Sequence, residues 1–328
     1  MSSPSVSVVM PTYDAADYIE RSLESILHQS FDDFELIIVD DGSTDSTIDL
    51  IEKRDDERIR LVERENESGI TSALNRGIDE SHGKYIARHD ADDWSAPERF
   101  DRQVTYLDTH SDVALLGTGA HLVDEDGKRI AKRRVLEDPE VGDLIDHNEF
   151  IHGSVMMRRE PLVDLGGYDE RFLTAEDYDL WLRLADRHSV ANIDEPLYYF
   201  RQHDESIYGS NLKMLKLYHV LATRRVDDGF DKELYAAITT DDPKKAIEMF
   251  TTEERTWFHT ELARESIRYG NLSSGREHVR EAIRLNPTDL TLPAMLLLTY
   301  TTPKIASVVV DTYRKVINAK ISVENRSG

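Results

Sequence analysis

Three aspartates within four residues, Asp90, Asp92 and Asp93, form a group whose type and spacing could do chemistry. Carboxylates this close together repel one another unless water or a cation lies between them. Hard divalent cations prefer oxygen ligands, and Mg²⁺ usually binds one or two carboxylates together with substrate phosphates. In a chain with 64 acidic residues the same run could also be a solvated acidic turn. Its meaning therefore depends on the segments around it.

Two more polar clusters lie closer to the N-terminus. The first is segment 11–14, Pro-Thr-Tyr-Asp, in which the ring of Tyr13 could stack on a nucleotide base or make only a hydrophobic contact. The second is segment 40–45, Asp-Asp-Gly-Ser-Thr-Asp. The carboxylate of Asp41 could accept a hydrogen bond from a base N–H. The alternative is a tight turn whose polar side chains cap the next helix.

Each of these clusters follows an apolar run that predicts a buried strand. The expected strands are residues 6–10, 36–39, 59–62 and 85–87. The segments between them carry apolar residues at helical spacing. Alternation of strands and helices predicts an α/β fold, in which a mostly parallel sheet is covered by helices. Ligands of such sheets bind beyond the carboxyl ends of the strands. We therefore expect segments 11–14, 40–45 and 90–93 to converge at one edge.

The remainder of the chain is less regular and ends in helices. Strands are expected at 113–117, 151–157 and 198–200, a helix at 178–185, and a helical hairpin at 256–288 that breaks at Gly270-Asn271. The pattern is helical from residue 211 onward. We therefore expect three parts, namely a domain over 1–210, a helical region over 211–300 and a tail over 301–328.

The tail differs from the rest of the chain in charge. From residue 295 onward five basic residues stand against two acidic ones, which gives 5 − 2 = +3. The apolar residues Ile305, Val308, Val309 and Val316, together with Thr312, fall on one helical face. Such a basic amphipathic segment could lie on an anionic membrane surface. The alternative is a terminal helix that packs on its own domain.

Composition limits the class of partner. Acidic residues outnumber basic ones by 64 to 40, and the resulting net charge of −24 argues against nucleic acid. The absence of Cys excludes disulfides, thiolate catalysis and Cys-ligated zinc. The polar start of the chain predicts no signal peptide. No apolar run reaches the roughly 18 residues that a membrane span needs.

The same composition favours adaptation to salt. Acidic residues are many, and the chain has 12 Lys against 28 Arg. At molar salt the Debye length is only about 3 Å, so the self-repulsion of such a chain would be screened. The alternative is an ordinary acidic protein from a low-salt cytosol.

Taken together, these segments resemble the family 2 glycosyltransferases, which have the GT-A fold. The matching blocks are Val6–Tyr13, Phe34–Asp45, Asn75–Gly77, Gly83–Ala87 and Asp90–Asp93. Their order and spacing make the resemblance specific over residues 5–205. It implies a GT-A-type sheet flanked by helices, followed by the helical C-terminal region.

The resemblance also implies roles for matched residues on the donor side. Pro11, Thr12 and Tyr13 are expected to line the nucleotide pocket, and Asp41 to bind the base. Asp92 and Asp93 belong to the acidic run.

Within that run, Asp92 is expected at the ribose or the metal, and Asp93 at the metal that holds the diphosphate. Asp90 keeps at most a supporting role.

Glu176 and Asp177 open a predicted helix, and the resemblance makes Asp177 the expected general base. An inverting transfer needs a carboxylate to take the proton of the acceptor hydroxyl. The alternative is a pair that only favours the helix N-terminus. Arg201 and His203 follow the last expected strand, where Arg201 could contact the nucleotide sugar and His203 the metal. His152 resembles the acceptor-side strand entry.

These assignments predict an inverting glycosyltransferase that uses Mn²⁺ or Mg²⁺ and a nucleotide-diphosphate sugar. The expected acceptor is a glycan, a polyprenyl- or dolichol-linked lipid, or a protein, in lipid-linked or surface-glycoprotein glycan assembly of the N-glycosylation type. The expected setting is a haloarchaeal cytoplasm, with peripheral contact to the cytoplasmic face of the membrane. Two alternatives are a non-catalytic nucleotide-sugar-binding assembly subunit and a nucleotidyltransferase. The sequence leaves the donor sugar, the base, the acceptor, the linkage and the oligomeric state open.

Overall fold

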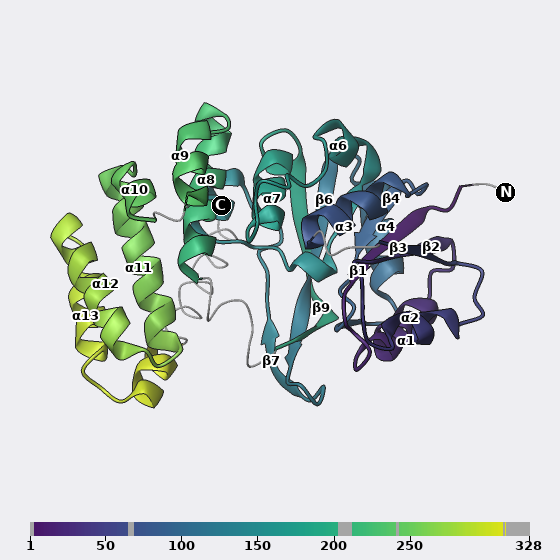
Figure 1. Cartoon of the computed structure of the whole chain (residues 1–328), viewed down its shortest axis with the longest axis horizontal. Helices are drawn as coiled ribbons and strands as arrows, with labels where there is room; N and C mark the ends of the chain where they lie inside the picture. The colour runs from purple at the N-terminus through teal and green to yellow at the C-terminus, as the bar shows by residue number, and fades with distance from the viewer. Residues whose placement is uncertain (1–2, 65–68, 203–211, 241–242, 311, 313–328) are drawn as a thin grey trace. The chain divides into compact units, whose positions relative to one another are not determined.

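The computed structural model describes residues 3–64, 69–202, 212–240, 243–310 and 312. The chain divides into two compact units, residues 1–204 and 205–328. The first unit is a sheet flanked by helices, and the second is helical (Figure 1). The predicted α/β fold with a helical C-terminal region is confirmed.

Nine strands in the described part of the first unit form one sheet. They are β1 (Val6–Thr12), β2 (Phe34–Asp40), β3 (Ile59–Glu63), β4 (Tyr85–Arg88), β5 (Trp94–Ser95), β6 (Val113–Val123), β7 (Arg129–Arg133), β8 (Met156–Arg158) and β9 (Ser189–Arg201). Their order is β3-β2-β1-β4-β8-β6-β9-β5, and β7 pairs with β6. The first four strands are parallel, as predicted. Beyond β4 the sheet is mixed, because β8 runs antiparallel to both of its neighbours.

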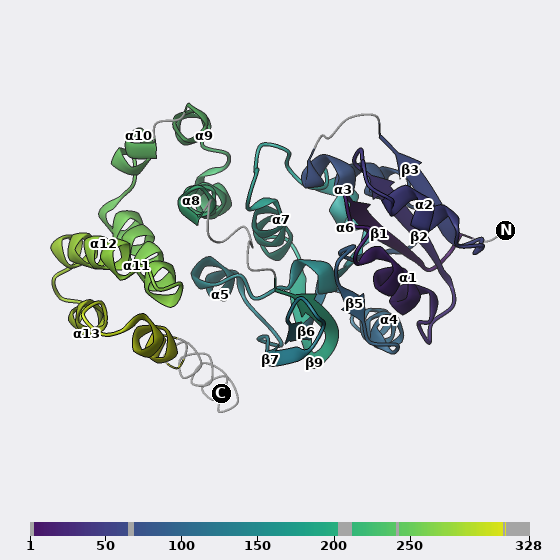
Figure 2. The same ribbon diagram turned by 60° about the horizontal axis from the view of Figure 1, so that its bottom comes forward.

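Helices cover both faces of the parallel half. The helices of the first unit are α1 (Ile19–Leu27), α2 (Thr47–Glu52), α3 (Ile70–Asp79), α4 (Arg99–Thr109), α5 (Val141–Asp146), α6 (Arg159–Asp164) and α7 (Glu176–Ala185). Figure 2 shows α1 and α4 on one side of the sheet and α3 on the other. Val8 and Leu36 pack in the same core as α1 and α4, whereas Val39 packs with Ala73 of α3. These strands are buried on both faces, which explains why they read as continuous apolar runs.

Close packing of α3 on β1 depends on Gly77. A Cβ atom at this position would overlap Cγ1 of Val9 and lie 3.4 Å from Cγ2 of Val39. The glycine of the Asn75–Gly77 block therefore brings a helix close to the sheet. This helix carries Ala73, which lines the cavity described below.

Segment 151–157, predicted as one strand, is a turn followed by a strand. The short 3-10 helix η1 (His152–Ser154) precedes β8. The hydroxyl of Ser154 donates to the carbonyl of Ile151 at 2.9 Å, which closes the chain on itself instead of extending it. The strand prediction was therefore wrong over the first half of this segment.

The second unit consists of helices. They are α8 (Leu212–Asp228), α9 (Lys232–Thr239), α10 (Pro243–Glu248), α11 (Thr252–Arg268), α12 (Leu272–Leu285) and α13 (Thr291–Leu298). The predicted hairpin is confirmed, because α11 and α12 are separated at Gly270 and Asn271. Gly270 has a φ of +78°, and the side chain of Asn271 accepts the N–H of Ser274 to cap α12.

Part of the predicted tail packs on this unit. Residues 303–310 are helical, and Ala306 is buried in a core with Ala263 and Val279. Ile305 and Val308 are exposed. Residues 311 and 313–328 lie outside the described part of the chain. None of the helices described is long and apolar enough to span a membrane.

Candidate active site

The three polar clusters predicted to converge do so, around a cavity of about 320 Å³ beyond the carboxyl ends of β1, β2 and β4. Its lining residues are Pro11, Thr12, Tyr13, Asp14, Ala15, Tyr18, Asp41, Gly69, Ile70, Ala73, Asp90, Ala91 and Asp92. This set includes five residues that were expected to contact the nucleotide, namely Pro11, Thr12, Tyr13, Asp41 and Asp92. The parallel register of β1 with β2 and β4 explains the convergence, because it brings the ends of these strands together.

Hydrogen bonds join the first two clusters into one wall. Asp14 accepts the N–H of Thr44 at 2.7 Å, and its own N–H donates to the hydroxyl of Ser43 at 2.9 Å. Asp40 accepts the N–H of Ser43 at 2.9 Å and so shapes the turn. The wall is thus held by Asp14 and Asp40, the side chains next to the predicted binding residues.

Asp41 is buried at the bottom of this wall. One carboxylate oxygen accepts the N–H of Gly69 at 2.8 Å, and the other lies 3.3 Å from a guanidinium nitrogen of Arg64. Tyr13 is 48% exposed and lines the cavity. Arg64 is a neighbour that the sequence did not indicate.

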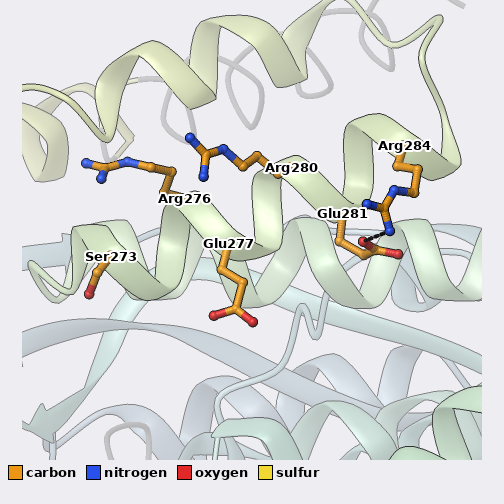
Figure 3. Close-up of a pocket in the computed structure, with 6 residues that line it drawn as sticks. All are labelled: Ser273, Arg276, Glu277, Arg280, Glu281 and Arg284. Atoms are coloured by element: carbon orange, nitrogen blue, oxygen red, sulfur yellow. Dashed lines mark hydrogen bonds and ion pairs between the residues drawn. The ribbon is translucent and has the colours of Figure 1, made fainter.

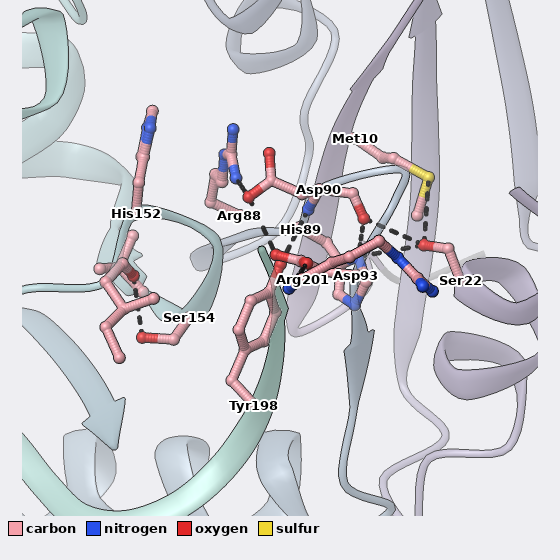
Figure 4. A network of polar contacts seen from close by, with 12 residues as sticks. Met10, Ser22, Arg88, His89, Asp90, Asp93, His152, Ser154, Tyr198 and Arg201 are labelled. Atoms are coloured by element: carbon pink, nitrogen blue, oxygen red, sulfur yellow. Dashed lines mark hydrogen bonds and ion pairs between the residues drawn. The ribbon is translucent and has the colours of Figure 1, made fainter. Parts of the chain in front are cut away.

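Asp90 and Asp92 of the acidic run also line the cavity. Figure 4 shows the polar contacts around Asp90 and Asp93. Asp90 pairs with the buried guanidinium of Arg88, and its N–H donates to the hydroxyl of Tyr198 at 3.1 Å. Asp93 is buried, and its Oδ1 accepts the N–H of Arg201 at 2.6 Å. Its Oδ2 has no hydrogen-bond partner among the described residues. Burial raises the pKa of Asp93 well above its usual value, and the charge of Asp92 raises it further.

Arg201 holds the acidic run from the end of β9. Its guanidinium donates to the carbonyl of Asp92 at 2.9 Å and to the carbonyl of Glu125. The guanidinium carbon also lies 4.6 Å from the ring centre of Tyr18, which lines the cavity. His203, the other predicted residue of this segment, lies outside the described residues.

The pair Glu176 and Asp177 begins α7. The carboxylate of Asp177 accepts two hydrogen bonds, from the N–H of Tyr178 at 2.7 Å and from the amide of Asn148 at 3.1 Å. Burial raises the pKa of Glu176 to about 7, and the charge of Asp177 adds to this. Burial also raises the pKa of Asp177. Two buried carboxyls side by side resist being ionised together, and the two donors favour the negative charge on Asp177.

Arg88 connects the acidic run with the acid pair. It is 2% exposed at the end of β4. Its positive charge lowers the pKa of Asp93, of Glu176 and of Asp177. Both acidic groups therefore lie around this buried guanidinium. The signal for it in the sequence is a charged residue that ends an apolar strand, which no motif includes.

The turn at residues 152–154 packs against the acidic run. A Cβ atom on Gly153 would lie 2.5 Å from Oδ2 of Asp90 and would overlap the hydroxyl of Tyr198. His152 places Nε2 2.9 Å from the hydroxyl of Tyr168. Burial, together with Arg88, lowers the pKa of His152 well below its usual value, so the ring is neutral at pH 7.

A second hollow, of about 440 Å³, lies along α12 in the other unit (Figure 3). It is lined by Ser273, Arg276, Glu277, Arg280, Glu281 and Arg284. Arg284 pairs with Glu281 at 3.1 Å, and Arg280 donates to the hydroxyl of Tyr300 at 2.9 Å. Alternating charges one turn apart are typical of a solvated helix face. This hollow is not a candidate active site.

Comparison with known proteins identifies the family. The profile of the family described as Glycosyl transferase family 2 matches residues 7–166. EpsE of Bacillus subtilis (strain 168), which is named as a glycosyltransferase, is 37% identical over 62% of this chain and 76% of that protein. The O-antigen biosynthesis glycosyltransferase WbnJ of Escherichia coli is 31% identical over 63% of this chain and 83% of that protein. The chain belongs to glycosyl transferase family 2.

Solved structures support the same fold. TarS of S. aureus (residues 1–349, in complex with UDP-GlcNAc) has a TM-score of 0.59 and 18% identity, over 95% of this chain and 92% of that chain. The mannosyltransferase PcManGT of Pyrobaculum calidifontis, in complex with GDP-Man and Mn²⁺, has a TM-score of 0.53 and 18% identity, over 96% of this chain and 89% of that chain. The family 2 member described here is therefore a glycosyltransferase with a GT-A-like fold.

Proposed function

We propose that this glycosyltransferase binds a nucleotide-diphosphate sugar in the cavity and transfers the sugar, with inversion, to an acceptor hydroxyl or phosphate. The observation that carries the proposal is the placement of the acidic run and the Glu176–Asp177 pair around Arg88. The complexes of TarS with UDP-GlcNAc and of PcManGT with GDP-Man support the same class of donor.

The donor would lie with its base against the wall formed by the first two clusters. The half-exposed ring of Tyr13 would stack on the base, and Asp41 would accept a hydrogen bond from a base N–H. Pro11 and Thr12 border the nucleoside. The diphosphate then reaches Asp92 at the opposite side of the cavity, where Arg201 supports the backbone.

The described residues contain no group of three or more His, Asp or Glu side chains that could hold a metal ion by themselves, so Asp92 and Asp93 would bind a divalent cation only together with phosphate oxygens of the donor. The buried Oδ2 of Asp93 is without a hydrogen-bond partner in the described part of the chain, as a metal ligand would be in the absence of its metal. We propose that Asp93 and Asp92 hold Mn²⁺ or Mg²⁺, with His203 as a further candidate ligand. When bound, the ion neutralises the departing nucleoside diphosphate. The Mn²⁺ in the complex of PcManGT supports this assignment.

Asp177 would be the general base. As the acceptor oxygen bonds to the anomeric carbon, the bond from that carbon to the diphosphate oxygen breaks, and Asp177 takes the acceptor proton. Glu176 keeps its own proton, since the donors around Asp177 favour the charge there. General base catalysis of this kind contributes typically about 10²–10⁴-fold to the rate.

A panel of UDP-, GDP- and dTDP-sugars, assayed for metal-dependent hydrolysis and transfer, tests the proposal. Asp177→Asn should lower turnover by roughly 10²–10⁴-fold and leave nucleotide binding intact. The exposed Asp186→Asn at the other end of α7 is the matched control and should behave as wild type. Near-normal turnover of Asp177→Asn would rule out the base assignment.

The proposed metal ligand is tested separately. Asp93→Ala should remove the dependence of nucleotide binding on Mn²⁺, measured by thermal shift and calorimetry. Activity that survives EDTA would show that no metal is required.

The acceptor belongs to a broader proposal. We infer a role in the assembly of a lipid-linked or surface glycan, with a glycan, a polyprenyl- or dolichol-linked lipid or a protein as acceptor. Relatives named for O-antigen and amylovoran biosynthesis support a surface glycan. We propose a role of the N-glycosylation type by analogy within the family, and a haloarchaeal origin because the composition is acidic and poor in Lys.

We also propose a division of labour along the chain. Residues 1–210 carry catalysis, residues 211–300 form a supporting helical region, and the basic tail over 301–328 holds the enzyme at the cytoplasmic face of the membrane. Deleting residues 301–328 should shift the protein from the membrane fraction to the soluble fraction. If the protein stays in the same fractions after the deletion, the tail does not bind the membrane.

A further inference from the structure

Asn148 is a polar side chain on the acid pair that the proposed mechanism has not yet used. It lies between α5 and η1, and its Nδ2 donates to Oδ2 of Asp177 at 3.1 Å. The other oxygen, Oδ1, accepts the N–H of Tyr178 at 2.7 Å. One donor comes from the helix that carries Asp177, and the other reaches it across 29 residues of sequence.

The orientation of the Asn148 amide is set by a second hydrogen bond. Its Oδ1 accepts the N–H of Phe150 at 3.1 Å. The opposite orientation would place a carbonyl oxygen against the carboxylate and an NH₂ group against an N–H, which pairs acceptors with acceptors and donors with donors. Asn148 can therefore only donate to Asp177. A donor of this kind stabilises the ionised form of a carboxylate and not the protonated one.

The segment that carries Asn148 is itself anchored. A guanidinium nitrogen of Arg133, on β7, donates to the carbonyl of Asn148 at 3.0 Å and lies 3.4 Å from the carbonyl of Phe150. The charge of Arg133 also lowers the pKa of Asp177. One strand thus supports the base in two ways, through the backbone of Asn148 and through the electrostatic field.

Two further groups near Asp177, Arg88 and Tyr168, do not decide which acid is ionised. Arg88, on β4, lowers the pKa of both Glu176 and Asp177. The buried phenol of Tyr168 is uncharged, because burial raises its pKa. Asn148 differs from these two groups, since its side chain donates a hydrogen bond to Asp177.

We propose that Asn148 is a positioning residue that keeps Asp177 in its ionised form and fixes the orientation of its carboxylate, so that the proton of the pair stays on Glu176. This rests on the proposed role of Asp177 as the base. Asn148 is not among the residues that line the cavity, so its loss should affect kcat and its pH dependence while the KM for the nucleotide sugar stays the same.

The test compares Asn148→Asp with Asn148→Ala. The probe reaction is Mn²⁺-dependent hydrolysis of UDP-GlcNAc or GDP-mannose, in which water takes the place of the acceptor and still has to lose a proton. Asn148→Ala removes the donor, so the acid limb of the kcat profile should move to higher pH and kcat at pH 7 should fall about tenfold for each unit of movement. Asn148→Asp adds a third carboxylate and should move the limb further.

A second readout does not depend on activity. The melting temperature of Asn148→Asp, relative to wild type, should fall progressively as pH rises from 5 to 9, because three neighbouring carboxylates cannot all ionise cheaply. Asn286→Asp makes the same chemical change at the end of α12 and should show no such trend. If Asn148→Asp does not fold, Asn148→Ser replaces it, since its hydroxyl donor should give a smaller shift than Asn148→Ala.

The outcomes separate the two proposals. If Asp177→Asn abolishes turnover but the Asn148 variants lose activity equally at every pH, the positioning role is wrong and the base assignment stands. If Asp177→Asn keeps near-normal turnover, Asp177 is not the general base. The melting series on Asn148→Asp then still reports whether the amide controls the ionisation of the pair.

Discussion

At the scale of single residues, the site is controlled by acids that differ in surroundings and not in type. Asp93 and Glu176 are both buried, and burial raises both pKa values. Asp93 keeps an oxygen without a hydrogen-bond partner among described residues, which suits a cation. Asp177 has two hydrogen-bond donors, which favour its ionised form and suit a base. One residue type thus serves two tasks.

Glu176→Gln tests the shared proton. The folded protein raises the pKa of Glu176 from 4.5 to about 7, so it holds the proton more tightly than the unfolded chain does. Stability should therefore fall as pH rises from 4.5 through 7, by up to roughly 3 kcal/mol at about 1.4 kcal/mol per unit. Glu176→Gln has no ionisable group at this position, so its stability should not show this dependence on pH.

The melting temperature of Glu176→Gln, measured against wild type, should therefore increase over that window and level off above pH 7. Because Glu176 carries its proton when Asp177 is ionised, the neutral amide of Gln replaces a neutral carboxyl, and the acid limb of the kcat profile should stay in place. A difference in melting temperature that stays constant from pH 4.5 to 8 would contradict the shared proton.

At the scale of elements, the site depends on close approach between segments. The sheet brings β1, β2 and β4 to one edge, while β9 returns to place Tyr198 and Arg201 beside the acidic run. The turn η1 fills the space next to Asp90 without a side chain at its central residue, Gly153. Elements distant in sequence thus share one small region.

Gly153→Ala tests that close approach. The new methyl group would lie 2.5 Å from Oδ2 of Asp90 and would overlap Tyr198, so the acidic run or the turn has to move. We expect a loss of about 1–3 kcal/mol in unfolding free energy from overpacking and at least a tenfold weaker Mn²⁺-dependent binding of nucleotide. Chemical denaturation and calorimetry measure the two effects.

Gly142→Ala is the matched control, because a Cβ atom at Gly142, on α5, would meet nothing within 4 Å. It should leave binding unchanged. Unimpaired nucleotide binding in Gly153→Ala would show that the packing of η1 on Asp90 is not needed by the site.

At the scale of the whole molecule, charge is the dominant property. A net charge of −24 on 328 residues creates self-repulsion that the folded state has to tolerate. Local pairs relieve part of it, as where Arg224 contacts both Asp231 and Glu254 in the second unit. We propose that the remaining repulsion is an adaptation to salt.

Thermal unfolding in KCl tests this proposal. The melting temperature should rise by several degrees between 0.1 and 2 M KCl, since the Debye length shrinks from about 10 Å to less than about 3 Å over this range. Sucrose, which stabilises by exclusion without screening, is the control. A melting temperature that rises equally in sucrose, or falls in KCl, would favour an ordinary acidic protein.

Much of the fold followed from local patterns in the sequence. Apolar runs ending at Pro11, Asp40 and His89 predicted the parallel strands, and Gly270-Asn271 predicted the break between α11 and α12. These features depend on side-chain periodicity and backbone preference within a few residues. Segment 151–157 was misread because its apolar residues match a strand, whereas the hydroxyl of Ser154 closes a turn.

The sequence by itself determined that the acidic run, the Asp41 turn and Tyr13 meet, because strand order in a parallel sheet is enough to bring strand ends together. Only the tertiary structure decided the surroundings of each acid. Arg88 lies 89 positions before Asp177, Asn148 lies 29 before it, and Tyr198 lies 108 after Asp90. No local spacing links such residues. Their contacts arise when mixed strands and α7 pack on the parallel half, and this packing decides which carboxylate is buried, which is paired and which keeps its charge.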